Sequence, residues 1–179
     1  MKYFEVQDTP ELKYAPQLKN WYGSFDVRDI RLETFPKLPD MQMFLLESSE
    51  NTVFTDIILF PFLLISPMIH EVINMYQECC FFRNVILLNP FNQESKLYYL
   101  PVFSEISNIQ LYKKQYDNGN YISDTIIPQK EAIRPDKNIF WVSDSKKRHI
   151  ILSMDIAESL IRRGVTGLEL CEVELYQEN

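Results

Sequence analysis

The sequence is poor in glycine and histidine, and each shortage excludes a class of functional site. It has four glycines, and none of them lies in a phosphate-binding loop or a dinucleotide-binding fingerprint. The two histidines are His70 and His149. His70-Glu71 begins a zinc-protease motif, but residue 74 is Asn, so the second histidine ligand is missing. We therefore expect no metal and no cofactor, and we interpret His70 as a partly exposed helix residue.

Cysteine is also scarce. The three cysteines, Cys79, Cys80 and Cys171, are an odd number and form no disulfide framework, which is typical of a protein from a reducing compartment. Cys79 and Cys80 are adjacent, a spacing that suits neither a metal site nor a redox pair, and Phe81-Phe82 follow them. We expect both thiols to behave as small buried apolar groups, with a reactive thiol as the alternative.

Long hydrophobic runs are absent. The start of the chain, residues 1–6, lacks the apolar run and cleavage site of a signal peptide. The longest apolar stretch, residues 57–69, is interrupted by two prolines and a serine and is shorter than the ~20 residues that span a bilayer. We expect a cytoplasmic protein that does not bind membranes.

Acidic residues outnumber basic ones, 25 to 18, which gives a net charge of -7. This balance argues against non-specific nucleic-acid binding, which requires an excess of Lys and Arg. It suits a protein that attracts a basic partner by electrostatic steering. The 12 Phe, 10 Tyr and 2 Trp residues predict a core rich in aromatic rings.

The centre of the chain, from Thr55 to Phe103, predicts a strand, a helix and a hairpin in that order. An apolar run at 57–65 predicts a strand, and Ser66-Pro67 after it is typical of a helix start. Apolar residues then recur at helical spacing as far as Tyr76. Val85–Leu88 predicts a strand buried on both faces, and turn residues at 89–95 predict a hairpin with a partner strand at 97–100.

The C-terminal part predicts a second unit of the same kind. Strands at 139–142 and 149–152 form a hairpin, and Ser153 caps a helix that Gly164 closes. The last strand, 168–176, changes the phase of its alternation, which predicts a β-bulge that leaves Glu172 and Glu174 facing outward.

The remaining segments give weaker signals. Residues 3–6 predict a short strand, 25–32 a strand with a slip, 41–46 a strand or a short helix, and 104–111 a turn and an edge strand. We expect one α+β domain over residues 1–179. Its sheet is predicted to be mostly antiparallel or mixed, with two Ser-capped helices (66–78 and 153–163) packed on it. Four residues serve as structural caps: Ser66, Pro67, Ser153 and Gly164.

Residues 112–138 are the least core-like region. Asn118-Gly119 is a strong hairpin signal, and tyrosines flank it among polar residues. The segment is either a solvated hairpin or a loop that contacts a partner. As candidate contact residues we name Tyr116, Asp117, Tyr121, Glu172 and Glu174.

Two regions resemble a known family. Residues 56–111, with Phe62-Leu63-Leu64-Ile65-Ser66 and Leu97-Tyr98-Tyr99-Leu100-Pro101, look like the central part of a bacterial immunity-protein family first named from a myxobacterial member. Residues 139–176, with Gly164-Val165-Thr166-Gly167-Leu168, are similar to that family's C-terminal strand–Ser–helix–strand signature. The matched positions Ser66, Pro67, Ser153, Thr166 and Gly167 are expected to be structural.

The resemblance implies a function without catalysis. Proteins of this family are encoded beside polymorphic toxins of interbacterial competition, including type VI secretion effectors, and they protect the producing cell by binding the toxin. We therefore expect an immunity protein that occludes a cognate toxin, binds neither nucleic acid nor membrane, and is not an enzyme. Self-association into a homodimer is left open. The alternatives are a small enzyme with a site built from carboxylates or His70, and a non-catalytic adaptor subunit.

Overall fold

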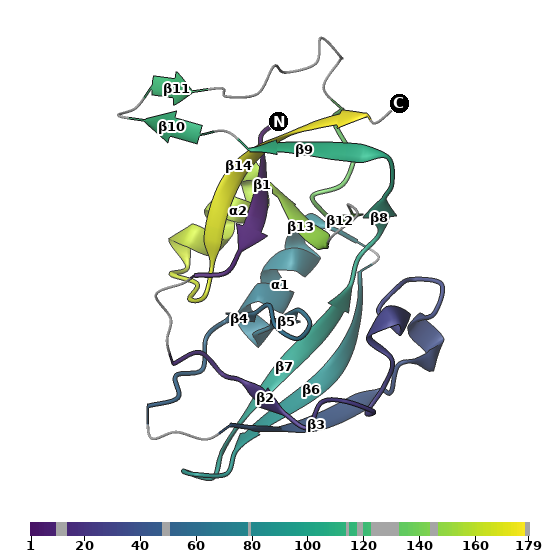
Figure 1. The fold of residues 1–179 in the computed structure, drawn as a ribbon, viewed down its shortest axis with the longest axis vertical. Coiled ribbons are helices and arrows are strands. Elements are labelled where there is room, and N and C mark those ends of the chain that lie inside the picture. Colours follow the sequence, from purple (N-terminus) through teal and green to yellow (C-terminus); the bar gives the residue numbers. More distant parts are fainter. Residues whose placement is uncertain are drawn as a thin grey trace.

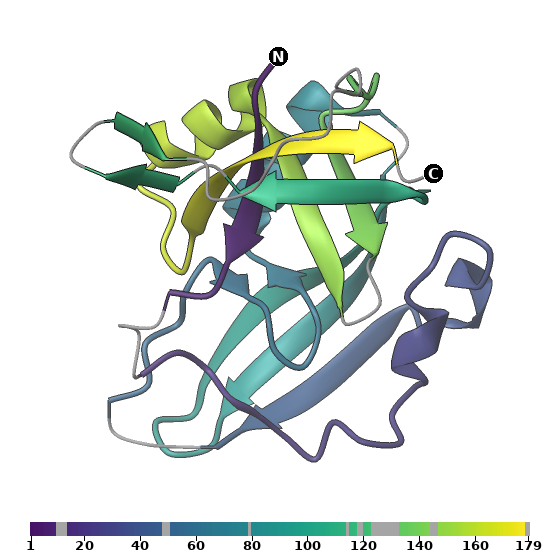
Figure 2. The same ribbon diagram turned by 45° about the horizontal axis from the view of Figure 1, so that its top comes forward.

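The computed structural model describes residues 1–9, 14–47, 51–78, 80–113, 115–117, 120–122, 133–143 and 147–177. These residues form two six-stranded sheets, a separate two-stranded hairpin and two α-helices. The first sheet occupies the upper half of Figures 1 and 2, and the second sheet the lower half. The predicted α+β class is confirmed, with the strands divided between two sheets.

The first sheet has the order β8-β12-β13-β1-β14-β9 and is built around the N-terminal strand. Strand β1 (Tyr3–Gln7) lies between β13 (Arg148–Ser153) and β14 (Glu169–Gln177) and is antiparallel to both. The other strands are β12 (Ile139–Ser143), β8 (Glu105–Ile106) and β9 (Ile109–Lys113). The predicted strand at 3–6 and the predicted hairpin at 139–152 are confirmed. Residues 104–111 supply both edges of this sheet, β8 and the start of β9.

This sheet is buried on both faces, which explains the change of phase in β14. Leu170 packs with the helices on one face, whereas Val173 and Leu175 pack with a second apolar cluster on the other. Strand β14 pairs residue for residue with β1 along its first half and with β9 along its second. The predicted β-bulge is therefore wrong. The apolar side chains change face because both faces need them.

The second sheet has the order β2-β3-β6-β7-β5-β4. Its strands are β2 (Leu18–Lys19), β3 (Met41–Leu46), β4 (Ile57–Ile58), β5 (Leu64–Ile65), β6 (Phe81–Asn89) and β7 (Glu94–Val102). The β6–β7 hairpin is confirmed, although both strands are longer than predicted. Residues 41–46 form a strand that runs parallel to β6.

Two predictions for this sheet are wrong. The apolar run at 57–65 doubles back on itself: β4 and β5 pair antiparallel, and the loop between them contains a cis Phe60–Pro61 bond. Strand β6 is not buried on both faces, because Val85 and Leu87 are buried while Ile86 and Leu88 are only half-buried.

The two helices pack on each other; α2 packs on β13 and β1 of the first sheet, whereas α1 packs between that sheet and β7 of the second. Helix α1 (Pro67–Tyr76) buries Ile69, Val72 and Ile73, and α2 (Met154–Arg162) buries Ile156, Ala157 and Leu160. These residues share one apolar cluster with β12 and β13. Both stripes have the 3.6-residue period that the sequence predicts. No helix of the described residues is long and apolar enough to cross a membrane.

The predicted capping is partly wrong. Ser66 and Ser153 occupy the N-cap positions, but neither hydroxyl accepts a helical N–H. The Ser153 hydroxyl donates instead to Asn138 Oδ1 at 2.9 Å, whereas the Ser66 hydroxyl is buried without a hydrogen-bond partner among the described residues. Pro67 begins α1 as predicted.

Gly164 closes α2 as predicted. Its φ of +66° lies in the left-handed region that suits glycine. Its N–H bonds to the Ile161 carbonyl at 3.0 Å, and the Val165 N–H bonds to the Leu160 carbonyl at 3.3 Å. This pair of bonds is the Schellman motif.

Residues 25–32 form no strand. They contain a 3₁₀ helix, η1 (Val27–Asp29), which begins where the Asp26 side chain accepts the Arg28 N–H; a second 3₁₀ helix, η2 (Phe35–Lys37), follows. Phe25, Val27 and Ile30 pack on the buried face of the second sheet. Their spacing therefore reflects an irregular segment that covers a sheet, not a strand.

Candidate functional site

The loop Leu59–Leu63, which joins β4 to β5, separates two hollows. Its two phenylalanines have opposite environments: Phe62 is buried under the second sheet, whereas Phe60 is 71% exposed. Asp8, Leu59 and Phe60 line both hollows. We call them the aromatic hollow and the charged cleft.

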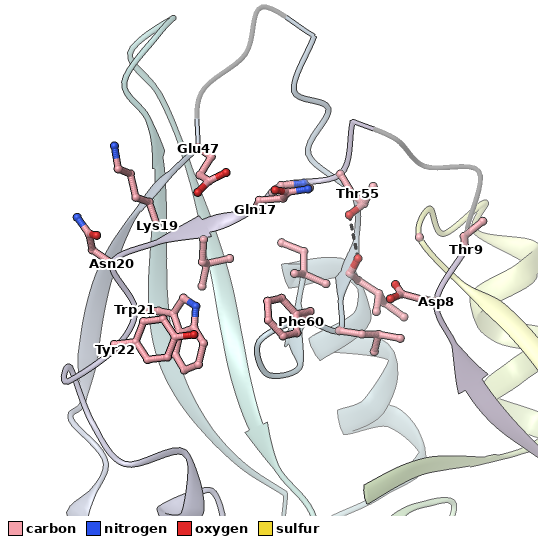
Figure 3. Close-up of a pocket in the computed structure, with 17 residues that line it drawn as sticks. Asp8, Thr9, Gln17, Lys19, Asn20, Trp21, Tyr22, Glu47, Thr55 and Phe60 are labelled. Atoms are coloured by element: carbon pink, nitrogen blue, oxygen red, sulfur yellow. Dashed lines mark hydrogen bonds between the residues drawn. The ribbon is translucent and has the colours of Figure 1, made fainter. Parts of the chain in front are cut away.

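The aromatic hollow, about 860 Å³ in volume, is lined by Trp21, Tyr22 and Phe60 (Figure 3). The Trp21 and Tyr22 rings stack with their centroids 3.8 Å apart. The Trp21 ring also meets Phe60 and the buried Phe62 edge-on, each at 6.3 Å. Tyr22 is 78% exposed. Trp21 therefore ties an exposed aromatic group to the core of the molecule.

Polar side chains surround these rings. Figure 3 shows two groups on either side of the hollow: Gln17, Lys19, Asn20 and Glu47 near β2 and β3, and Asp8 and Thr9 after β1. A central aromatic group inside a polar border is the composition that protein-binding surfaces share.

The wall beside Phe60 is fixed by contacts between β4 and the turn before β14. The Thr55 hydroxyl donates to the Ile57 carbonyl at 2.8 Å, the bond dashed in Figure 3. The Thr166 N–H and hydroxyl both donate to Asp56 Oδ2, at 2.9 and 2.8 Å. Gly167 has a φ of +80°, and a Cβ there would lie 2.7 Å from the Ile57 carbonyl oxygen. Thr166 and Gly167 thus hold the first sheet against the second, in agreement with the structural role expected for them.

The charged cleft has a volume of about 1030 Å³ and lies between the end of β1, η1 and the loop Leu59–Leu63. Two carboxylates, Glu5 and Asp8, line it, together with five basic side chains. These are Arg28, Arg31, Lys113, Lys147 and Arg148. Basic side chains therefore outnumber carboxylates in its lining, although Arg28 and Arg148 pair with Asp26 and Glu105 outside it.

Glu5 is the most buried charged group of the cleft, with 1% of its surface exposed. It accepts hydrogen bonds from His149 Nδ1 at 2.7 Å and Gln7 Nε2 at 2.8 Å, and it forms ion pairs at 3.1 Å with Lys113 and Lys147. Burial alone raises the pKa of the Glu5 carboxyl, but these four donors together outweigh burial and lower the pKa to about 2. Glu5 is therefore ionised at neutral pH.

The Glu5–His149 pair resembles part of a catalytic site, because a carboxylate that bonds one ring nitrogen orients a histidine. A carboxylate with a pKa of about 2 is too weak a base to remove a proton at neutral pH. Any acid–base chemistry in the cleft would therefore fall to His149, which is itself buried.

The other candidate groups of the sequence do not form a site. His70 is half-buried as predicted, stacks on Tyr99 at 4.1 Å, and has its pKa lowered by burial. Cys80 and Cys171 are half-buried thiols, and burial raises the pKa of Cys171. Cys79 lies outside the described residues. Within the described part of the chain, no group of three His, Cys, Asp or Glu residues could hold a metal.

The structure separates the predicted contact residues. Residues 115–117 (β10) and 120–122 (β11) form the predicted hairpin, with Tyr116 opposite Tyr121 and Asp117 opposite Asn120. The hairpin extends away from the first sheet (Figures 1 and 2). Asn118 and Gly119 lie outside the described residues.

Glu172 and Glu174 do not face freely outward, which corrects that part of the prediction. Both are half-buried. Glu172 pairs with Lys2 at 3.5 Å, and Glu174 accepts the Tyr176 hydroxyl at 2.6 Å. Both carboxylates are on the same face of β14 as Leu170, because no bulge intervenes.

The sequence predictions missed Trp21, Tyr22, Phe60, Glu5 and His149. A signal existed for the first two, since Trp21-Tyr22-Gly23 stands in an irregular segment where apolar rings have no helix or strand to cover. Phe60 lies in an apolar run that predicts a strand, so nothing in the sequence indicated its exposed side chain. Glu5 and His149 are 144 residues apart, and only the pairing of β1 with β13 brings them together.

Comparisons with protein-family models, with curated proteins and with solved structures found no match for this chain. The likeness to the immunity-protein family therefore depends on the sequence motifs alone.

Proposed function

We propose that this chain is an immunity protein, which binds a cognate bacterial toxin encoded next to it and neutralises the toxin by covering its working surface. The observation that supports this proposal most is the exposed aromatic group of the hollow. Tyr22 and Phe60 are 78% and 71% exposed, yet Trp21 holds them in fixed positions against the core.

Rigid exposed aromatics favour binding to another protein. Tyr and Trp bury a large area with little loss of conformational freedom, and they are the residues on which binding energy concentrates. Single exposed apolar residues are common on any surface, but stacked rings beside a hollow are not explained by that background. The hollow accepts a protruding side chain of the partner between β2 and the loop Leu59–Leu63.

The direct test is capture of the protein encoded beside this chain, followed by titration of the complex. We expect Tyr22→Ala and Phe60→Ala each to weaken binding by about 30-fold, equivalent to ~2 kcal/mol. Phe91→Ala is the matched control, because Phe91 is also exposed but lies in the β6–β7 turn outside the hollow. Its effect should stay within about twofold. Failure to capture the neighbouring product counts against the immunity function itself.

The hairpin β10–β11 remains a second contact prediction. Tyr116→Ala and Tyr121→Ala test it in the same titration. A loss of binding in these variants, with Tyr22→Ala unchanged, would move the contact from the aromatic hollow to the hairpin.

A small enzyme is the second candidate, and the Glu5–His149 pair in the charged cleft is the observation that favours it. The four donors on Glu5 argue for a structural anchor instead, because they leave its carboxylate ionised and fully engaged. His149→Gln separates the two: an enzyme loses turnover, whereas an immunity protein still protects cells that express the toxin. An adaptor subunit would associate with other proteins but would protect no cell.

A further inference from the structure

The second sheet has an apolar face that the other described segments cover only at its α1 end, where His70 packs on Phe82 and Tyr99. Strand β3 exposes Met41, Met43 and Leu45, and β7 exposes Leu97; between 42% and 61% of each side chain's surface is accessible. Ile86 and Leu88 of β6 are half-buried between them. We call these six residues the open face. The open face shares no residue with the aromatic hollow, and its role does not depend on the function proposed above.

The strand register makes the open face continuous. Met43 lies beside Ile86, which lies beside Leu97, and Leu45 lies beside Leu88 in the next row. The alternate residues of the same strands, among them Phe44, Leu87 and Tyr98, form the buried core on the opposite face. This sheet is therefore apolar on both faces, although the second face is packed only where Phe82 and Tyr99 meet α1.

The boundaries of the open face are also defined. At one end His70 of α1 stacks on Tyr99 of β7. At one edge Lys19 of β2 stands beside Leu45. Three rows of paired residues cross this face of β3, β6 and β7. None of the nine residues in them is charged. The rows are Met41, Asn84 and Tyr99; Met43, Ile86 and Leu97; and Leu45, Leu88 and Ser95.

We propose that the open face is where two copies of this chain associate. Two bodies that each carry a charge of -7 repel, so they approach at least cost through a surface without charge. A basic partner would instead be drawn to the acidic parts of the surface. A core without charged residues is also the composition that homodimer interfaces favour.

A two-fold axis parallel to β6 gives a self-complementary contact. Around that axis Ile86 meets Ile86 of the second copy, Leu88 meets Leu88, and Met43 meets Leu97. No charged side chain faces its own copy. Met41 and Met43 are flexible enough to fill the gaps that two twisted sheets leave.

The size of the open face sets the strength of the association. Three strands about 4.8 Å apart and five residues of ~3.4 Å each cover on the order of 250 Å² in projection. A stable interface buries ~800 Å² on each partner. We therefore expect a weak dimer whose population rises with concentration.

Sedimentation velocity of the full chain tests this association, in a dilution series from about 5 to 500 μM. We expect the mass to rise from 21.3 kDa toward twice that value. Met43→Glu places a charge against the apolar Leu97 of the second copy and should raise the dissociation constant at least tenfold. Ile161→Glu is the control, because Ile161 is equally exposed but belongs to α2 on the first sheet, and it should leave the constant unchanged.

A cysteine on the expected axis gives a second measurement. Ile86→Cys should give a covalent dimer with a short bismaleimide cross-linker, because sheets packed face to face lie ~10 Å apart, which is too far for a disulfide. The wild-type chain and Ile161→Cys should not be cross-linked. A wild-type chain that stays at 21.3 kDa at every concentration overturns the proposal. Dimers that survive Met43→Glu, or that Ile161→Glu weakens equally, overturn it too. Loss of toxin capture in Met43→Glu with a monomeric wild type would assign the open face to the toxin.

Discussion

The two sheets use their second faces differently. The first sheet packs apolar side chains on both faces, and its buried carboxylate, Glu5, is held by four donors. The second sheet packs one face and covers the other only at its α1 end, and the aromatic hollow lies at its β2 edge. The comparison indicates that the first sheet supplies stability, whereas the second supplies surfaces for contact.

A pair of Leu→Ala substitutions, one in each sheet, tests most sharply whether the first sheet supplies the stability. Leu175→Ala in β14 removes a side chain that is 1% exposed, and Leu45→Ala in β3 removes one that is 42% exposed. We expect the first to lower the free energy of unfolding by ~2–5 kcal/mol, because it leaves a cavity. The second should cost no more than ~0.5 kcal/mol. Urea unfolding of both variants measures the difference, and equal losses would contradict the assignment of roles.

Low pH should reduce the free energy of unfolding, because it protonates Glu5 in the first sheet. Folding lowers the pKa of Glu5 from 4.5 to about 2, so the folded state binds this proton less tightly than the unfolded state. The resulting stability is complete above pH ~4.5 and is lost as the pH falls toward 2, by up to roughly 3 kcal/mol. Glu5→Gln removes this contribution, so its free energy of unfolding should fall less steeply than that of the wild type between pH 5 and 2. Parallel curves for the two proteins would show that Glu5 does not carry the effect.

The junction between the sheets can be tested at two glycines. Gly167→Ala combines a positive φ with a contact of 2.7 Å to the Ile57 carbonyl, and should lower the free energy of unfolding by ~1–3 kcal/mol. Gly164→Ala has the positive φ but nothing within 4 Å of the added Cβ, so it should cost only about 1 kcal/mol. Thermal unfolding compares the two. If Gly164→Ala proves the more harmful, the close approach of β4 to the turn at Gly167 does not matter for stability.

The smallest expected difference in stability is between alanine substitutions of Ser66 and Ser153, the serines at the starts of α1 and α2. Ser153→Ala removes a hydrogen bond to Asn138 and should cost about 1 kcal/mol. Ser66→Ala removes a buried hydroxyl that has no hydrogen-bond partner in the described part of the chain, so the variant should be at least as stable as the wild type. Calorimetric melting temperatures resolve this, and a clear loss in Ser66→Ala would mean that its hydroxyl does bond in solution.

The elements that the sequence predicted are those whose patterns lie within a short stretch of adjacent residues. The hairpins at 81–102 and 139–153 have apolar strands joined by polar turns, and α2 has its Gly164 stop. Both helices and the strand at 3–7 were found in the same way. In these segments, local pattern and tertiary packing favour the same structure.

The sequence could not predict features that depend on distant partners. The phase of β14 reflects burial on two faces, which requires knowing what covers each face. Residues 57–65 carry apolar side chains that suit a strand, yet they fold back because β5 pairs with β7. The charged cleft combines residues from 5–63 with residues from 113–150, and the aromatic hollow combines residues from 8–60 with Gly167.

The most direct test of the proposed division is a titration of the neighbouring gene's product against three proteins: the wild type, the double variant Tyr22→Ala/Phe60→Ala, and the control Phe91→Ala. If the contact lies at the aromatic hollow, the dissociation constant should rise at least a hundredfold in the double variant. The control should bind like the wild type. An unchanged constant in the double variant, with tight wild-type binding, would contradict the account.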